Sequence, residues 1–216
     1  MKKKLIGFDL DGVLIDSLPL MKIAWEECRS IYGFETDFSS YQNHIGKPFE
    51  LIMNSLDLDM YLPDIKQQYD QICMKNIDKI EPYKGIKELL QGLKKKNNCF
   101  SAIITSKTKS RAEKIVSKFQ FDHDLLITPE DTFKGKPNPE PLLMVNRFFD
   151  IRPSRNSCIY IGDMETDFLA SNSANWLFMH AAWGYGEISD IYDDNFFEKC
   201  DNIDSLNIYL ERWFKI

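Results

Sequence analysis

The sequence predicts an α/β protein in which a parallel β-sheet is covered by helices on both faces, with an all-helical segment inserted near the N-terminus. From residue 82 onward, short apolar runs of strand type alternate with amphipathic helical patterns. Strands that are apolar throughout are typical of a parallel sheet buried on both faces. Residues 17–80 show helical spacing of apolar residues and no strand pattern. We therefore expect residues 1–15 and 82–216 to form the core and residues 16–81 to form a helical insert.

The pattern of apolar residues also predicts the individual elements. Strands are expected at residues 5–8, 99–104, 125–127, 158–161 and 176–179. Ser17 can cap a first helix that ends at Gly33, and a helix of the insert follows each of Pro48 and Pro63. Further helices are expected at residues 86–93, 109–119 and 139–149, and from about residue 167.

Composition and charge restrict the class of protein. The chain has 216 residues, of which 44% are hydrophobic and 28% charged, as in an ordinary globular protein. A net charge of −6 argues against nucleic acid or an anionic membrane as the main partner. Asp9 and Asp11 break the apolar run that follows the lysine-rich start, which argues against a signal peptide. Because the five cysteines include no Cys-x-x-Cys pair, and Cys99 and Cys158 lie in strand patterns, we expect reduced thiols and a cytoplasmic location.

The stretch Asp9-Leu10-Asp11-Gly12 places two acids at the end of the first strand. Either the strand continues and both carboxylates share a face, or the glycine turn folds Asp11 back over Asp9. Like charges held this close usually serve a cation or a proton relay. The simpler interpretation is a strand followed by an Asp-Gly turn whose acids are solvated.

Other strands also end in polar side chains, namely Thr105 and Ser106 after one strand and Asp163 after another. Ligands of open parallel sheets bind at the carboxyl ends of strands, so these groups and the Asp9–Asp11 pair are expected in one crevice. Carboxylates at these positions suit Mg²⁺. Asp167, one helical turn after Asp163, either adds charge there or simply complements the start of a helix.

Several groups can bind an anion near this crevice. Thr105 and Ser106 precede a helix and either hold an anion or cap the helix. Lys136 lies between prolines in a loop that would fix its charge for a phosphate. His44 and Lys47, in a loop of the insert, are candidates for substrate contact, although simple solvent exposure also explains them. No dinucleotide or Walker glycine pattern occurs, and the three histidines match no Ser-His-Asp arrangement.

These residues resemble the haloacid dehalogenase superfamily, specifically its phosphatases with a helical cap inserted after the first motif. The chain matches four motifs in order: D-x-D-G at residues 9–12, a strand-end Thr at 105, K-P-x-P at 136–139 and G-D-x-x-x-D at 162–167. The resemblance implies a Rossmann-like three-layer α/β/α core with a parallel sheet and a small all-α cap domain.

The resemblance also implies a role for each motif residue. Asp9 would be a nucleophile that forms an aspartyl-phosphate, and Asp11 would protonate the leaving alcohol and then deprotonate water. Thr105 and Lys136 would hold the transferring phosphoryl group. The remaining phosphate contacts would come from Leu10 and Ser106.

A metal site follows from the same resemblance. Mg²⁺ would be bound by Asp9, by the backbone carbonyl of Asp11 and by Asp163, with Asp167 in support. The implied function is that of a Mg²⁺-dependent phosphatase acting on a small phosphorylated metabolite, as a monomer or homodimer. The runs 83–85, 105–107 and 183–186 are most similar to those of phosphoglycolate phosphatases.

Three alternatives stay open at this point. A phosphotransferase isomerase of the β-phosphoglucomutase type shares the four motifs, although its usual arginine-containing cap loop is replaced here by residues 45–48, Ile-Gly-Lys-Pro. A binding protein on the same fold would not need the whole set of polar residues. A carbon–phosphorus hydrolase would need a cap lysine, for which Lys22 and Lys47 are available but match no motif.

Overall fold

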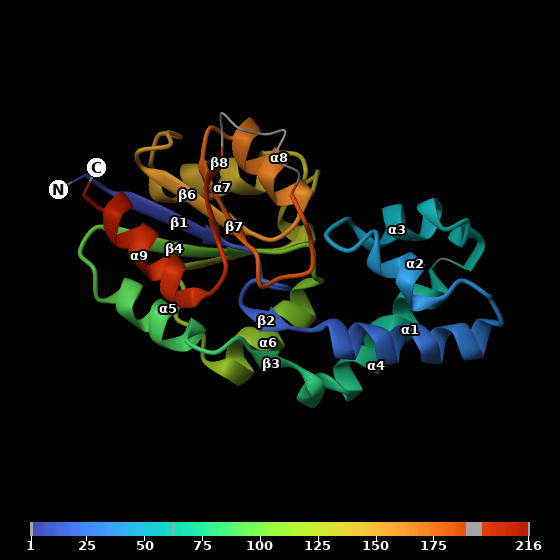
Figure 1. The fold of residues 1–216 in the computed structure, drawn as a ribbon. Helices are drawn as coiled ribbons and strands as arrows, with labels where there is room; N and C mark the ends of the chain where they lie inside the picture. The colour runs from blue at the N-terminus through green and yellow to red at the C-terminus, as the bar shows by residue number, and fades with distance from the viewer. Residues whose placement is uncertain (1, 62, 189–195, 216) are drawn as a thin grey trace.

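A computed structural model of the chain describes residues 2–61, 63–188 and 196–215. Within these residues the main sheet has six strands, all parallel, in the order β5-β4-β1-β6-β7-β8 (Figure 1). The strands are β1 Lys4–Phe8, β4 Cys99–Ile104, β5 Leu125–Ile127, β6 Cys158–Gly162, β7 Leu177–Ala181 and β8 Phe196–Cys200. The predicted parallel α/β fold is confirmed.

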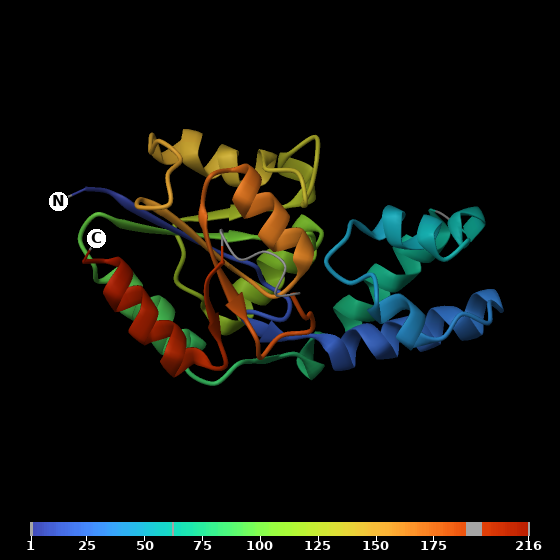
Figure 2. The same ribbon diagram turned by 45° about the horizontal axis from the view of Figure 1, so that its top comes forward.

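Helices cover both faces of this sheet. Figures 1 and 2 show α5 Ile86–Lys94, α6 Lys109–Phe119 and α9 Ile203–Trp213 on one face, and α7 Glu140–Phe149 and α8 Glu165–Ser173 on the other. Because successive strand residues point to opposite faces, β1 serves two cores. Ile6 and Phe8 pack in the cluster that contains α5, α6 and α9, whereas Leu5 packs in the cluster that contains α7 and α8.

The helical insert lies to one side of the core, beyond the carboxyl ends of the strands (Figure 2). It is joined to the core by a short antiparallel pair, β2 Ile15–Asp16 and β3 Glu81–Pro82. Between them lie α1 Leu18–Tyr32, α2 Phe38–Gln42, α3 Phe49–Ser55 and α4 Asp64–Lys75, with short 3-10 turns at Asp59–Tyr61 and Ile77–Lys79. The insert has its own aromatic packing, in which the buried Trp25 contacts Phe34 and Tyr41.

The expected boundaries agree closely with the structure, whereas β8, α2, α9 and the two-residue strands β2 and β3 were not predicted. The expected ranges of β4, β5 and α6 match their observed bounds, whereas α8 begins two residues earlier than expected. β8 was missed because Glu198 and Lys199 interrupt its apolar run, and α2 because it has only five residues. α9 was overlooked although Leu206, Leu210 and Trp213 have helical spacing.

All five cysteines are free thiols. Cys158 is fully buried as expected, whereas Cys99, at the first position of β4, is only half-buried. Among the described residues, every helix is too short or too polar to cross a membrane.

Candidate active site

The strand order places the candidate site at the centre of the sheet. β1 and β6 are neighbours, yet the chain continues from β1 toward β4 and from β6 toward β7, on opposite sides. Ligands of open α/β sheets bind at such a switch point. Asp9 directly follows β1 and Asp163 directly follows β6, while Thr105 follows the adjacent β4. The three polar strand ends therefore share one crevice.

Lys136 enters this crevice from the loop between β5 and α7 and links two of the acids. Its Nζ lies 2.8 Å from Oδ1 of Asp9 and 2.6 Å from Oδ1 of Asp167, and it also donates to the hydroxyl of Tyr160 at 3.0 Å. Burial lowers the pKa of Lys136, but Asp167 and Asp9 outweigh it and raise that pKa well above its ordinary value. The ammonium is a fixed positive charge beneath the site.

Three buried carboxylates meet beside Lys136. Asp9, Asp163 and Asp167 each offer an oxygen atom, and these oxygens lie within 4.8 Å of one another. Burial raises the pKa of Asp9 to about 7 although Lys136 opposes the shift, and burial with the charges of Asp167 and Asp9 raises the pKa of Asp163. The acids therefore repel one another when ionised.

The carboxylate group fits a divalent cation. When all three acids are ionised they carry −3 and Lys136 carries +1, so the fully ionised group has a net charge of −2. Oδ1 of Asp163 is buried and has no hydrogen-bond partner among the described residues, while Oδ2 accepts the backbone N–H of Tyr185 at 2.8 Å. A hard cation such as Mg²⁺ prefers oxygen ligands of this kind.

Gly12 is required by the packing around Asp163. Its φ is +81°, a conformation that side chains rarely adopt, and a Cβ there would lie 2.1 Å from Oδ2 of Asp163. The glycine that follows Asp11 thus lets the β1 turn approach the acid of β6. This close approach explains why the acidic pair is followed at once by glycine.

Asp11 is held apart from the carboxylate group by Ser17, at the start of the insert, and by Lys107 of the core. Ser17 Oγ donates to Oδ1 of Asp11, and Nζ of Lys107 lies 3.0 Å from the same oxygen. Ser17 occupies the N-cap position of α1, but its side chain makes no capping hydrogen bond, so the expected cap is wrong. The hydroxyl is used for Asp11 instead. The hydroxyl of Tyr185 accepts the backbone N–H of Ser17 at 2.6 Å and fixes this arrangement.

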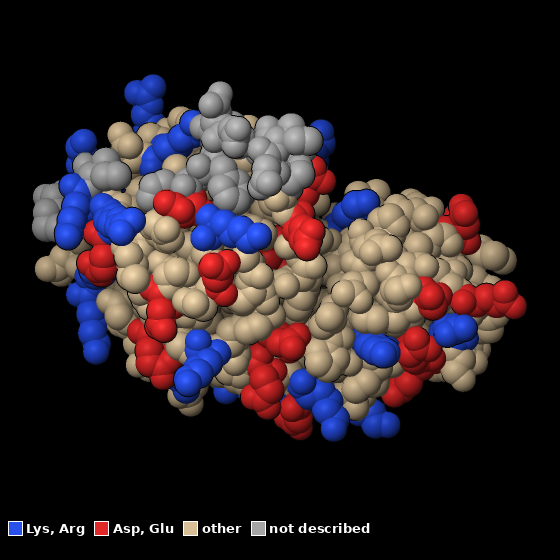
Figure 3. Space-filling model, in the orientation of Figure 1, with Lys and Arg blue, Asp and Glu red and all other residues tan. Residues whose placement is uncertain are grey.

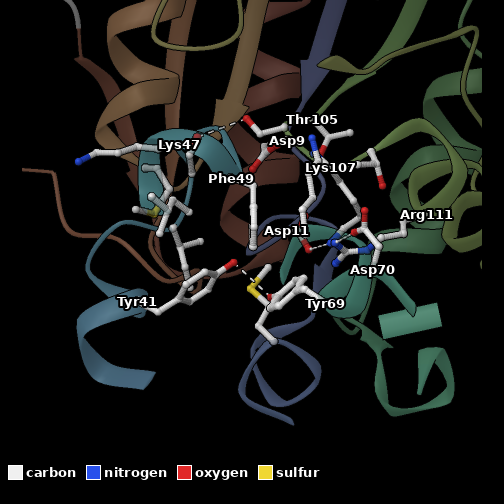
Figure 4. Close-up of a pocket in the computed structure, with 18 residues that line it drawn as sticks. Asp9, Asp11, Tyr41, Lys47, Phe49, Tyr69, Asp70, Thr105, Lys107 and Arg111 are labelled. Atoms are coloured by element: carbon white, nitrogen blue, oxygen red, sulfur yellow. Dashed lines mark hydrogen bonds and ion pairs between the residues drawn. The ribbon is translucent and has the colours of Figure 1, made fainter. Parts of the chain in front are cut away.

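A cavity lies between these core residues and the insert (Figure 4). Asp9 and Thr105 lie at one end of it, and Asp11 and Lys107 border it nearby. Its insert side includes Tyr41, Gly46, Phe49 and Tyr69. The two parts of the chain also touch directly, because Ser106 Oγ donates to the carbonyl of Gly46 at 3.3 Å.

The sequence pattern of the haloacid dehalogenase-like hydrolases matches residues 6–181 of the chain. The chain belongs to this family.

Known relatives of this haloacid dehalogenase-like hydrolase include phosphatases. A phosphoglycolate phosphatase of Mannheimia succiniciproducens is 27% identical over 219 residues, covering 90% of this chain and 94% of that protein. An N-acetylmuramic acid 6-phosphate phosphatase of Pseudomonas aeruginosa is 25% identical over 196 residues, covering 86% and 84%. The crystal structure of a hydrolase from Pseudomonas syringae has the same fold, with a TM-score of 0.82 and 23% identity over 98% of this chain and 99% of that one. The predicted superfamily and the resemblance to phosphoglycolate phosphatases are confirmed.

The residues expected to bind phosphate in the core, Thr105, Ser106 and Leu10, differ in their surroundings. Thr105 is buried, lines the cavity and accepts the backbone N–H of Lys107 at 3.1 Å. Ser106 also lines the cavity, whereas Leu10 does not, because its side chain is fully buried in the apolar core. Any contact of Leu10 with a phosphate must therefore use its backbone.

Lys47 and His44, the two substrate-contact candidates in the insert, differ in their position relative to the cavity. Lys47 borders the cavity, but Figure 4 shows its ammonium directed away from Asp9 and Thr105. Nζ of Lys47 lies 3.1 Å from Nδ1 of His44, and His44 itself does not line the cavity. His180 is buried, and its Nε2 lies 3.2 Å from the carbonyl of Gly186.

Two functional candidates were missed by sequence reasoning. Lys107 and Arg111 are both buried and both line the cavity. Lys107 directly follows Thr105 and Ser106, so its place beside two anion-binding candidates could have identified it from the sequence. Arg111 lies inside an amphipathic helix, where a charged residue is normally assigned to the solvent face.

Proposed function

We propose that this chain is a Mg²⁺-dependent phosphomonoesterase that acts on a small phosphorylated metabolite, similar to phosphoglycolate. The observation that carries the proposal is the buried group of Asp9, Lys136, Asp163 and Asp167, of which Asp9 borders the cavity. A buried acid beside a fixed cation and a cation-binding group suits phosphoryl transfer, which depends on positioning and charge stabilisation. The names of the two phosphatase relatives support the same reaction.

The carboxylates of Asp9, Asp163 and Asp167 would hold Mg²⁺, together with the backbone carbonyl of Asp11. When bound, the cation would neutralise the carboxylates and reduce the repulsion between Asp9 and an incoming phosphate. The net charge of −2 and the unpaired oxygen of Asp163 support this assignment. Residues 16–81 would act as the cap that closes the site.

The chain's own side chains carry the proposed reaction in two steps. In the first, a carboxylate oxygen of Asp9 attacks phosphorus, the bond to the leaving oxygen breaks, and Asp11 gives that oxygen a proton. In the second, Asp11 takes a proton from water, the water oxygen attacks the aspartyl-phosphate, and phosphate leaves while Asp9 is restored. Lys136 and Thr105 would bind the phosphoryl oxygens in both steps.

The surface charge supports a small substrate rather than a polyanion. Acidic and basic side chains are interspersed over the face shown in Figure 3, and the net charge is −6. A polyanion such as nucleic acid needs an extended basic surface. Attraction for a phosphate must therefore be local, as it is at Lys136. A monomer or homodimer remains our prediction for the assembly.

The proposal is tested by measuring phosphate release from phosphoglycolate, sugar phosphates and nucleoside monophosphates, with Mg²⁺ and with EDTA. We expect Mg²⁺-dependent release that falls by about a thousandfold or more in Asp9→Asn and Lys136→Met, since each removes a group that acts on the reacting phosphate. Lys134→Met, an exposed position two residues from Lys136, is the matched control and should retain activity.

Two results would contradict the proposal. Wild-type release no higher than that of Asp9→Asn across the panel would mean a binding protein on an enzyme fold. Isomerisation of a sugar phosphate that needs a bisphosphate primer, without net phosphate release, would mean a phosphotransferase isomerase.

A further inference from the structure

Two buried cationic side chains line one wall of the cavity, and neither takes part in the proposed bond-breaking steps. Lys107 and Arg111 are 6% and 7% exposed and lie on the segment that follows Thr105, with Arg111 in the first turn of α6. Figure 4 shows both on the same side of the cavity, with Asp9 and Thr105 at one end of it. Lysine and arginine are rarely buried unless they are paired with an anion.

The partners of these cations leave hydrogen-bonding capacity unused. Lys107 pairs with Asp11 at 3.0 Å, and Nη1 of Arg111 pairs with Oδ1 of Asp70 at 2.9 Å. In the described part of the chain each has this one ion pair, although a guanidinium has five N–H donors. Burial and the positive charge of Arg111 lower the pKa of Lys107. An anion between the two would relieve their repulsion.

A third polar group borders the same space. Oγ1 of Thr108, a cavity-lining residue between the two cations in sequence, is buried and has no hydrogen-bond partner among the described residues. A buried hydroxyl without a partner is costly, and a ligand atom would satisfy it. The segment from Lys107 to Arg111 thus presents an ammonium, a hydroxyl and a guanidinium.

The counter-ion of Arg111 can be exchanged. The Asp70 side chain, on α4 of the insert, is 30% exposed, whereas the Arg111 side chain is 9% exposed and its guanidinium stacks over Tyr69 at 5.4 Å. Asp70 can therefore turn toward water while Arg111 stays in the cavity wall. An arriving anion would replace Asp70 on a cation that is already in place.

We propose that Lys107, Thr108 and Arg111 bind a second anionic group of the substrate, a carboxylate or a second phosphate on a short link to the hydrolysed ester. The link is short because Lys107 lies 3.0 Å from Asp11, the group assigned to the leaving oxygen. Asp70 opposes binding, since its charge competes for Arg111. This site rests on the proposed phosphomonoesterase function and defines which esters the enzyme prefers.

The test uses two-carbon phosphate esters that differ in the charge of their second group: phosphoglycolate, ethyl phosphate and phosphoethanolamine. We expect kcat/KM to fall in that order, and ethylene glycol bisphosphate tells whether a phosphate serves as well as a carboxylate. Arg111→Met should lower the ratio of kcat/KM for phosphoglycolate over ethyl phosphate by about tenfold or more, because it removes a charged hydrogen-bond donor. Arg111→Lys should restore part of the ratio.

The direction in which Asp70→Asn changes the kcat/KM ratio decides whether Asp70 competes with the substrate for Arg111. If Asp70 competes with the substrate, this variant raises the ratio for phosphoglycolate over ethyl phosphate. Lys118→Met is the matched control, because it removes another ion pair of α6, with Asp78 at 2.9 Å, outside the cavity. It should leave the ratio unchanged.

The outcomes that overturn the site are distinct from failure of the proposed function. If Arg111→Lys and Asp70→Asn both lower kcat/KM equally for all esters, the ion pair only holds the insert in place. Equal ratios in wild type and every variant also overturn the second site while the phosphatase stands. No release above Asp9→Asn from any ester overturns both. Since Asp70→Asn keeps the size of the side chain, the sign test stands even if Arg111→Met does not fold.

Discussion

At the residue scale, the ionisation of an acid in the site depends on the charged groups buried beside it. In the proposed mechanism Asp9 attacks phosphorus as a carboxylate, yet burial raises its pKa to about 7 while Lys136 opposes the shift. Near neutral pH, a carboxylate with that pKa is only partly ionised. A divalent cation would favour the ionised form, so the metal and the nucleophile depend on each other.

This dependence predicts how stability changes with pH. The folded-state pKa of Asp9, about 7, exceeds the ordinary value of 3.8. The folded protein therefore holds a proton that the unfolded chain has lost, and this contribution to stability disappears as pH rises through 7. The pKa shift corresponds to a loss of about 0.8 kcal/mol between pH 6.5 and 8. Without metal, we therefore expect Tm to fall by about 2–3 °C over this range, at roughly 2–4 °C for each kcal/mol. Mg²⁺ should raise Tm more at pH 8 than at pH 6.5, measured by circular dichroism with EDTA or MgCl₂.

Asp9→Asn is the control, and its Tm should vary less over this range because it lacks the titrating carboxyl. Burial lowers the pKa of His180 below its ordinary value of 6.5, so His180 costs stability only as pH falls below that range. An unchanged slope in Asp9→Asn would show that the pH dependence arises elsewhere.

At the element scale, the loop after β7 connects Asp163, a proposed metal ligand, to Asp11, the proposed proton donor. The backbone N–H of Tyr185 donates to Asp163, and its hydroxyl accepts the N–H of Ser17 at 2.6 Å and donates to Oδ1 of Asp16 at 3.2 Å. Ser17 in turn donates to Asp11. The Tyr185 side chain thus fixes the start of the insert relative to the turn that carries Asp9 and Asp11.

Tyr185→Phe removes only the hydroxyl end of this connection. We expect kcat to fall by roughly tenfold with KM changed by less than about twofold, because Asp11 is less well oriented for proton transfer. The loss of stability should be about 1 kcal/mol, the net value of one hydrogen bond. Steady-state kinetics and urea unfolding measure the two effects. Tyr32→Phe, on α1 with a half-buried ring, is the comparison, and equal kinetic losses in both would exclude a positioning role.

The elements also show where sequence reasoning succeeds and fails. The strand β4 and helix α6 were predicted to their observed ends because apolar runs and helical spacing record burial directly. The motif residues Asp9, Thr105 and Lys136 were predicted from short motifs, and the structure places Asp9 and Thr105 at one cavity, with Lys136 2.8 Å from Asp9. Contacts such as Ser17 to Asp11 depend on how the insert meets the core, and no local pattern records a contact between distant segments.

At the scale of the whole molecule, substrate access depends on contacts between the insert and the core. These contacts include the hydrogen bond of Ser106 to Gly46 and the ion pair of Arg111 with Asp70. Polar interfaces of this kind permit relative motion of two parts of a chain. Both pairs line the cavity, so a ligand bound there would touch the insert and the core at once.

We therefore expect phosphate with Mg²⁺ to slow hydrogen exchange of the backbone amides in residues 43–49 by several-fold, because the ligand favours the closed arrangement. Exchange followed by mass spectrometry measures this, with NaCl at equal ionic strength as the reference. Amides of α9, far from the insert in Figure 1, should be unaffected. Slower exchange in the core loops alone, with none in residues 43–49, would contradict closure by the insert.

The short pair β2–β3 has a consequence for how such enzymes diverge. Ile15 pairs with Pro82 and Asp16 with Glu81, so the chain leaves the core and returns to it at adjacent positions. Everything between those positions can be replaced as one cassette without altering the strand order of the sheet. The insert side of the cavity can then change separately from the strand ends, while Lys107, Thr108 and Arg111 stay with the core. Exchange of this one uninterrupted length of chain would reshape the side of the cavity that faces Asp9 and leave the opposite side in place.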